Sequence, residues 1–161
     1  MNHITVNNHT FSYREQGSGP VALLVHGFPL DSTMWLDQMA ALSDIRRCVA
    51  PDLRGFGQAD PAVKIDATQG MADWGEDVLA LADQLGVDRF HAVGSSLGGN
   101  VVWWLIAHAP ERLRSAIQVC PGSPYGFGGT KDVDGTPCYD DWAGTGAGLI
   151  PAPFVEAIRA K

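Results

Sequence analysis

The chain has 161 residues, of which 45% are apolar, so it is long enough to form one domain with a buried core. Its 18 acidic and 11 basic residues give a formal net charge of −7. No cluster of basic residues interrupts this balance, which excludes a typical nucleic-acid-binding surface. The longest strongly apolar run, residues 101–107, is far shorter than the roughly 20 residues that cross a bilayer, so no membrane partner is expected.

The N-terminus and the cysteines favour a cytoplasmic protein. Residues 1–15 alternate polar and apolar side chains and show neither the basic start nor the apolar stretch of a secretory signal. Cys48, Cys120 and Cys138 form neither a metal-binding spacing nor an even set for disulfides, and we interpret them as reduced thiols. Because the sequence also lacks glycine-rich phosphate-binding motifs, we expect no metal and no cofactor.

The chain begins with a predicted antiparallel hairpin and then alternates strands with helices. The hairpin joins strands 4–7 and 10–15 around Asn7-Asn8. The later elements expected in chain order are strands at 21–25, 47–50, 90–93 and 115–120, and helices at 31–41, 71–85 and 99–109. This alternation predicts a parallel sheet with right-handed crossovers. The continuous apolar runs at 21–25 and 115–120 predict strands buried on both faces.

The sequence pattern changes at Pro121. The stretch up to residue 151 is rich in glycine, proline, aspartate and aromatic residues and shows no hydrophobic periodicity. Residues 153–160 resemble the start of an amphipathic helix, and the printed sequence stops within this pattern. We therefore divide the chain into residues 1–121, which form the sheet and its helices, and residues 122–161, which form a segment of a different kind.

Four segments in order carry a resemblance to a known family. They are His26-Gly27-Phe28-Pro29, residues 51–57 (PDLRGFG), Gly94-Ser95-Ser96-Leu97-Gly98, and Gly98-Gly99 at the start of the next helix. Through them residues 4 to about 125 resemble the α/β-hydrolase superfamily, in particular small cap-bearing esterases, enol-lactone hydrolases and perhydrolases related to epoxide hydrolases and haloalkane dehalogenases. The resemblance implies an α/β fold with a mostly parallel sheet and flanking helices. It also implies that residues 1–121 are the N-terminal part of the hydrolase core, that the chain is truncated after the sixth strand, and that residues 122–161 begin the cap.

Ser96 is the predicted nucleophile. A Gly-x-Ser-x-Gly at a strand-to-helix turn forms a nucleophile elbow, in which the serine adopts a strained backbone and its hydroxyl is exposed. Gly94 and Gly98 would allow the neighbouring backbone to approach this turn closely. The alternative is a serine that merely caps the following helix, but the two glycines and the preceding strand favour the nucleophile.

Two backbone amides are expected to form the oxyanion hole. One is the N–H of Leu97, the residue after the nucleophile. The resemblance implies that the other is the N–H of Phe28, for which core packing is the alternative. It also implies that His26 supports the oxyanion loop, together with Gly27, by side-chain hydrogen bonding and is not the catalytic base.

The histidine and the acid of a catalytic triad are missing from this chain. In the family both follow the serine in chain order, yet His108 is the only histidine after Ser96. It lies twelve residues further, about 18 Å along the predicted helix at about 1.5 Å per residue. A base must approach to about 3 Å. Glu111 is at the far end of the same helix, and the later acids fall in the irregular segment.

Two functions remain open. The first is a serine hydrolase that cleaves a carboxylic ester or lactone through an acyl-enzyme on Ser96, with a small molecule as its substrate. The second is a non-catalytic small-molecule-binding protein on the same scaffold. A serine at the elbow argues against epoxide opening and dehalogenation, which relatives perform with a carboxylate. Phe28, Trp35 and Tyr125 are candidates for an apolar acyl or alcohol site, with core packing as the equally common alternative. Standing alone, the chain is expected to be inactive, and a C-terminal fragment or a second copy would complete its sheet.

Overall fold

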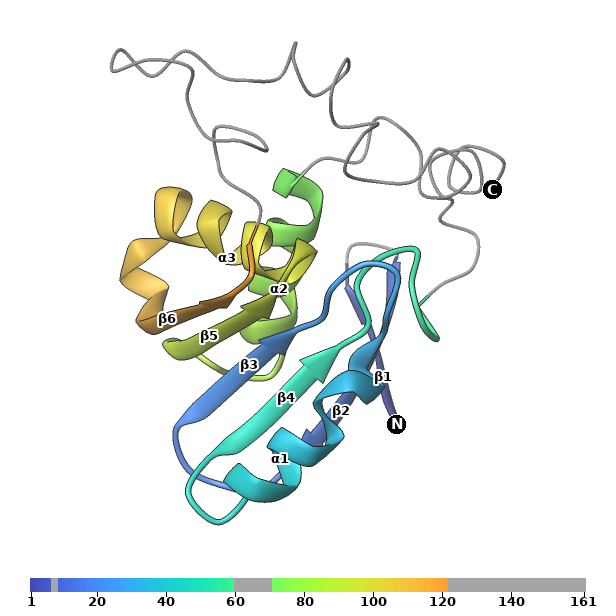
Figure 1. Cartoon of the computed structure of the whole chain (residues 1–161), viewed down its shortest axis with the longest axis vertical. Coiled ribbons are helices and arrows are strands. Elements are labelled where there is room, and N and C mark those ends of the chain that lie inside the picture. The colour runs from blue at the N-terminus through green and yellow to red at the C-terminus, as the bar shows by residue number, and fades with distance from the viewer. Residues whose placement is uncertain (7–8, 60–70, 122–161) are drawn as a thin grey trace, which may run out of the picture. The chain divides into compact units, whose positions relative to one another are not determined.

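The computed structural model describes residues 1–6, 9–59 and 71–121, all within one compact unit, Met1–Pro121. The elements along the chain are β1 (Asn2–Val6), β2 (His9–Gln16), β3 (Val21–Val25), η1 (Ser32–Trp35), α1 (Leu36–Leu42), β4 (Arg47–Pro51), α2 (Met71–Gln84), β5 (Phe90–Ser95), α3 (Leu97–His108), η2 (Pro110–Arg112) and β6 (Leu113–Val119). The six strands form one sheet in the order β1-β2-β4-β3-β5-β6 (Figure 1). The predicted cap segment, residues 122–161, lies outside the described residues.

The sheet is mostly parallel, as the alternating pattern predicts. Strands β4, β3, β5 and β6 run parallel to one another, whereas β2 pairs antiparallel with both β1 and β4. Strand β3 is central: its Leu23 pairs with Val49 of β4 on one side and with Ala92 of β5 on the other. The carboxyl ends of the parallel strands therefore meet at one edge of the sheet, where the loops of the candidate site begin.

Alternating side chains of the central strands form two cores, one on each face of the sheet. On one face Leu23 and Val25 pack with Trp74 and Val78 of α2 and Leu105 of α3. On the other face the core is smaller and includes the following residues: Ala22, Leu24, Trp35, Met39, Cys48 and Ala50. Figure 1 shows the same arrangement, with α2 and α3 grouped on the side of the sheet away from α1. Because β3 is covered on both faces, all five of its residues are buried.

The helices differ in detail from those expected. The element predicted at 31–41 begins as a 3₁₀ helix, capped by the Asp31 side chain, and becomes an α-helix only at Leu36. The helix expected from residue 99 begins at Leu97, directly after the candidate nucleophile. One face of α3 is buried through Val101, Val102 and Leu105. None of the helices in the described part of the chain is long and apolar enough to cross a membrane.

Strand β6 is not the buried strand that its apolar composition predicts. It pairs with β5 and forms the edge of the sheet among the described residues. Ile117 and Val119 are therefore 53% and 45% exposed. The apolar side chains of a central strand such as β3 are buried because other elements cover the strand on both sides. Among the described residues, β6 has such a neighbour only on its β5 side. The edge that the sequence predicts beyond residues 115–120 is thus observed within the described part of the chain.

Candidate active site

Ser96 occupies a sharp turn between β5 and α3. Its backbone has φ 51° and ψ −112°, a conformation that residues with a side chain rarely adopt and that costs on the order of 1–3 kcal/mol. The turn is held by a 2.8 Å hydrogen bond from the Ser96 N–H to the carbonyl of Val119 at the end of β6. The residue is exposed, and its side chain makes no capping hydrogen bond to α3. The hydroxyl therefore does not act as a helix cap.

Gly94 and Gly98 allow the turn to pack closely against its surroundings. A Cβ atom at Gly94 would overlap the backbone of Gly98, and one at Gly98 would overlap the carbonyl oxygen of Val25 at the end of β3. Both glycines are buried. Glycine is thus required at each position by close approach of backbone rather than by a positive φ.

The loop that follows β3 lies directly beside Ser96. A Cβ atom placed on Gly27 would lie 3.2 Å from Cβ of Ser96 and 3.1 Å from the carbonyl oxygen of Ser95. A hydrogen bond of 2.8 Å from the Leu30 N–H to the Gly27 carbonyl closes the turn of this loop, in which the Phe28–Pro29 peptide is cis. Gly27 therefore lies next to the elbow. Phe28 is 43% exposed, so core packing does not explain its presence.

His26 is fully buried at the base of this loop, and both of its ring nitrogens are engaged. The Leu53 N–H donates to Nε2 at 2.9 Å, so the proton resides on Nδ1, which donates to the Gly27 carbonyl at 3.0 Å. Burial lowers the pKa of His26, against the smaller opposing effects of the Gly27 carbonyl and of Asp52. The imidazole is therefore neutral near pH 7 and has no free nitrogen with which to act as a base.

The loop that follows β4 packs against the loop of His26. Phe56 contacts the rings of both His26 and Phe28 edge-on, with centroids 5.3 and 5.8 Å apart. Further along, Arg54 forms a two-pronged ion pair with Asp77 of α2, which includes an Nε–Oδ2 bond of 2.9 Å. The Asp77 hydrogen bond raises the pKa of Arg54 further. This pair ties the loop to α2.

The other histidines with described side chains make their contacts away from Ser96. His108 lies at the C-terminal end of α3, where Nδ1 donates to the carbonyl of Trp104 and the ring stacks on that indole. His91 bonds to Ser115 within the sheet, and His3 bonds to Ser12. Glu111 lies in η2, beyond the far end of α3. The later acidic residues fall outside the described residues, so the described part of the chain brings no histidine or acid to the elbow.

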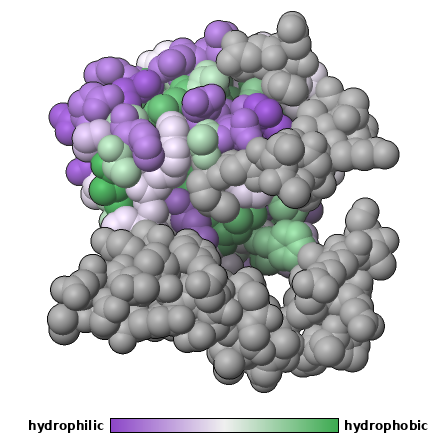
Figure 2. Space-filling view, turned by 90° about the horizontal axis from the view of Figure 1, so that it is seen from above, coloured by the Kyte–Doolittle hydropathy of each residue, from purple (hydrophilic) through white to green (hydrophobic). Residues whose placement is uncertain are grey.

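Trp35 does not line the candidate site. It is 6% exposed and packs in the smaller core with Met39, which excludes it from the apolar acyl site suggested by the sequence. Tyr125, the third candidate, lies outside the described residues. In the view from above, apolar and hydrophilic residues are both visible on the surface of the described part (Figure 2). The large exposed apolar side chains of the loop beside Ser96 are those of Phe28 and Leu30, at 43% and 48%.

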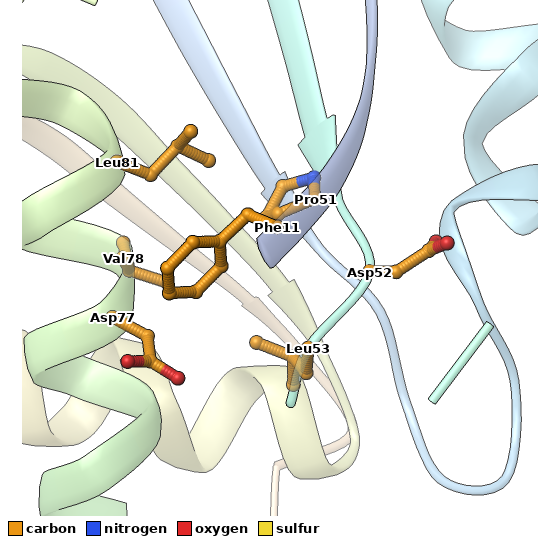
Figure 3. Close-up of a pocket in the computed structure, with 7 residues that line it drawn as sticks. All are labelled: Phe11, Pro51, Asp52, Leu53, Asp77, Val78 and Leu81. Atoms are coloured by element: carbon orange, nitrogen blue, oxygen red, sulfur yellow. The ribbon is translucent and has the colours of Figure 1, made fainter. Parts of the chain in front are cut away.

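The hollow drawn in Figure 3 is not the candidate site. It lies between β2 and α2, where Phe11, Leu53, Val78 and Leu81 line it, and it has no room for a water molecule. It is a packing gap in the larger core, away from the exposed serine. Among the described residues no group of three histidine, cysteine or acidic side chains could hold a metal ion.

Two hydrogen-bond acceptors at the site, one backbone carbonyl and one side-chain sulfur, were not predicted from the sequence. The carbonyl of Val119 accepts the Ser96 N–H, and the sulfur of Met34 accepts the Gly27 N–H at 3.5 Å. Neither contact has a signal in the sequence, because each joins residues whose types are common at such positions. Asp52, by contrast, belongs to the segment 51–57, where the sequence favours Asp52 and Arg54 as residues that shape the loop after their strand over an ion site.

Comparison with known proteins places this geometry in context. The family model described as alpha/beta hydrolase fold matches residues 20–145. Epoxide hydrolase 3 of Siraitia grosvenorii is 33% identical over 131 residues, which cover 77% of this chain and 41% of that protein. Carboxylesterase YbfK of Bacillus subtilis (strain 168) is 32% identical over 107 residues, 66% of this chain and 35% of that protein. The enol-lactonase from Burkholderia xenovorans LB400 superimposes with a TM-score of 0.66 at 28% identity, over 71% of this chain and 45% of that structure. The chain spans less than half of each of these proteins.

Proposed function

The chain belongs to the α/β hydrolase family, and we propose that it carries the nucleophile and the oxyanion hole of a serine hydrolase acting on carboxylic esters or lactones. Ser96 attacks the carbonyl carbon. The backbone N–H groups of Leu97 and Phe28 stabilise the negative charge that develops on the carbonyl oxygen. His26, Gly27, Gly94 and Gly98 give the two loops the shape that places these amides.

One observation carries the proposal: the exposed, strained Ser96 lies directly beside Gly27. The serine is held in a backbone conformation that it would not adopt without support from its surroundings, which is common at functional sites. Its hydroxyl has no structural task as a helix cap. A Cβ atom placed on Gly27 would lie 3.2 Å from Cβ of Ser96. The two loops that we propose to form the oxyanion hole therefore lie side by side.

The reaction requires a base that the described residues do not supply. A serine hydroxyl is a weak nucleophile until a base removes its proton, and in this family a histidine oriented by an acid performs that step. An acyl-enzyme then forms on Ser96, the alcohol leaves, and water activated by the same base releases the acid. In this proposal the histidine comes from beyond residues 1–121, so the described unit alone has at most a small residual activity.

The ester or lactone class rests on the serine and on the relatives. The Bacillus subtilis relative is named a carboxylesterase, and the superimposed Burkholderia structure an enol-lactonase. The Siraitia grosvenorii relative is named an epoxide hydrolase. Opening an epoxide by covalent catalysis requires a carboxylate nucleophile, and this chain presents a hydroxyl at the elbow. A hydroxyl nucleophile suits acyl transfer, in which the oxyanion hole holds the charge.

A fluorophosphonate probe with added imidazole tests the proposal. Imidazole at about 0.1–0.2 M can replace a missing histidine, because it is small enough to reach an exposed hydroxyl. Peptide mapping by mass spectrometry should find the phosphonyl adduct on Ser96, with a yield that rises with imidazole concentration. Ser96→Ala should abolish it, and Ser43→Ala, a change at the distant end of α1, should leave it intact. An adduct distributed evenly over many serines, with none enriched at Ser96, would refute the proposal.

A non-catalytic binding protein is the second candidate. It is favoured by the engagement of His3, His26, His91 and His108 in contacts away from Ser96. The same labelling experiment discriminates between the two. If a small ester or lactone binds with a measurable heat while Ser96 remains unlabelled at every imidazole concentration, the chain binds without turnover.

Two further features belong to the same proposal. The exposed edge of β6 is the surface at which a C-terminal fragment or a second copy would complete the sheet, since Ile117 and Val119 are exposed there. A reducing, cytoplasmic setting agrees with Cys48 and Cys120, which are both free thiols. The third cysteine, Cys138, lies outside the described residues.

A further inference from the structure

The carboxylate of Asp52 joins two loops at the carboxyl edge of the sheet. Asp52 is 1% exposed and follows β4 directly. Its Oδ1 accepts the N–H of Ser32 at 2.8 Å, and its Oδ2 accepts the N–H of Gln58, also at 2.8 Å. Its own N–H donates to the carbonyl of Ser12 in β2. A single buried side chain thus binds the loop that follows β3 and closes the loop that follows β4.

We propose that Asp52 is a positioning residue of the candidate oxyanion hole, which acts by fixing the far end of the loop that carries the Phe28 amide. The proposal rests on the function proposed above for its catalytic meaning. The placement of the loop by Asp52 can be tested separately, because it is a property of the fold and does not depend on a reaction.

The loop from His26 to Ser32 is fixed at its two ends by Asp52 and Leu53, two consecutive residues that follow β4. At the near end, the Leu53 N–H binds Nε2 of His26 at 2.9 Å. At the far end, the Asp52 carboxylate binds the Ser32 N–H. The residues between these two points include the exposed Phe28 and Leu30. Movement of either end would displace the Phe28 amide relative to Ser96, and catalysis is sensitive to displacements of about 1 Å.

Between the two ends the loop has weaker support. The Gly27 N–H has only a sulfur acceptor, Sδ of Met34 at 3.5 Å, and sulfur accepts hydrogen bonds poorly. The ring of Phe56 contacts Phe28 edge-on. Phe56 belongs to the same loop that Asp52 closes through Gln58, so the carboxylate also determines where this ring lies. Asp52 therefore acts on the Phe28 amide through both loops.

The surroundings of the carboxylate suit this function. Hydrogen bonds from amides to an ionised carboxylate are stronger than those between neutral groups. The bond from Ser32 is buried, and the bond from Gln58 is partly buried. Figure 3 shows the Asp52 side chain directed away from Phe11, Val78 and Leu81, toward the segment that leads into α1. A Cβ atom on Gly57, which has φ +55°, would overlap the carboxylate. The loop after β4 thus wraps closely around this side chain.

Amide hydrogen exchange measured by NMR on the whole 161-residue chain tests the placement. Asp52→Asn keeps the shape but leaves one carbonyl oxygen for two amides, because its NH₂ group cannot accept. We expect exchange of the Ser32 and Gln58 amides to accelerate tenfold or more and the Phe28 amide resonance to shift, while exchange of Leu24 in β3 remains within twofold. Asp52→Ala, which removes both acceptors, should accelerate exchange further. Equal acceleration throughout the sheet, or none in the loop, would overturn the proposal.

Asp31→Asn is the matched control. Asp31 lies in the same loop, and its carboxylate accepts hydrogen bonds from the N–H and the hydroxyl of Thr33. Its Cβ atom lies near Gly57, and Asp31→Asn keeps this atom, so the packing against the loop after β4 is unchanged. The replacement should change exchange at Thr33 and leave exchange at Gln58 unchanged. Should Asp52→Asn fail to fold, couplings across the hydrogen bonds between Cγ of Asp52 and the amide nitrogens of Ser32 and Gln58 can be measured in the unaltered chain. Their absence would overturn the proposal as well.

The reaction of Ser96 with the fluorophosphonate and imidazole separates positioning from general support. For Asp52→Asn we expect the maximal labelling rate to fall tenfold or more while the probe concentration at half-maximal rate stays within twofold. An unchanged maximal rate would overturn the positioning role even if exchange accelerates. If the unaltered chain is never labelled at Ser96, the proposed hydrolase function fails, and the exchange measurements still decide whether Asp52 places the loop.

Discussion

Replacing His26 with phenylalanine should lower the free energy of unfolding by about 1–3 kcal/mol. The ring is fully buried and its size is nearly kept, so the change acts through the two hydrogen bonds that phenylalanine cannot make. The Gly27 carbonyl still accepts the Leu30 N–H, so only the Leu53 N–H is left without a partner. A buried polar group left without a partner costs about 1–3 kcal/mol, which gives the expected range.

Urea unfolding followed by circular dichroism measures this loss, with the slope of the transition checked for constancy. His108→Phe is the matched control. His108 is exposed and bonds only to the carbonyl of Trp104 within its own helix, so its replacement should change stability by less than about 0.5 kcal/mol. A loss below about 0.5 kcal/mol for His26→Phe, no larger than that of the control, would refute the reasoning, since it would mean that the bond from the Leu53 N–H contributes nothing or that water replaces it.

Three other predictions follow from described residues. Stability should be full above about pH 6.5 and fall as the pH decreases toward 5. The reason is that burial lowers the pKa of His26, so the unfolded chain binds a proton in this range that the folded chain does not. Urea midpoints measured at each pH test the decline, and a flat profile would contradict it. The variant His91→Gln, which removes the other histidine with a lowered pKa, should retain most of that decline. Gly98→Ala should cost about 3 kcal/mol or more in thermal unfolding through overlap with the Val25 carbonyl, whereas Gly86→Ala, with φ +68° and open space around it, should cost no more than about 1–2 kcal/mol; equal costs would argue against close approach at the elbow. Leu105→Ala should cost about 2–5 kcal/mol because the side chain is fully buried, and the exposed Leu36→Ala should stay within about 0.5 kcal/mol in the same urea assay.

Local patterns were sufficient to predict the elements and the elbow. The alternation of apolar runs with helix-like stretches predicts the mostly parallel sheet, and the spacing of Gly94, Ser96 and Gly98 predicts a tight turn at the observed place. These signals depend on neighbours in sequence. The steric need for glycine at both positions arises within the same short segment and the end of β3.

Features that depend on distant partners were harder to predict. Strand β6 is apolar like β3, and composition alone does not tell whether other elements cover its faces, so the predicted burial of its side chains is wrong although the unpaired edge was expected. For Trp35 the sequence leaves substrate contact and core packing open, and the structure places the side chain in the smaller core. The link between Asp52 and Ser32 joins residues 20 positions apart, and only the folded sheet edge brings them together.

The hydrogen bond from the Ser96 amide to the Val119 carbonyl has a mechanical consequence. It connects the residue with a positive φ in the elbow to the last residue of a strand that ends the sheet on one side. Because Ser95 also pairs with Val119, a displacement of β6 by another strand or by a ligand that contacts Ile117 would reach the elbow through the pairing with β5 as well as through this 2.8 Å bond. The outer edge of the sheet and the turn at Ser96 are therefore mechanically coupled.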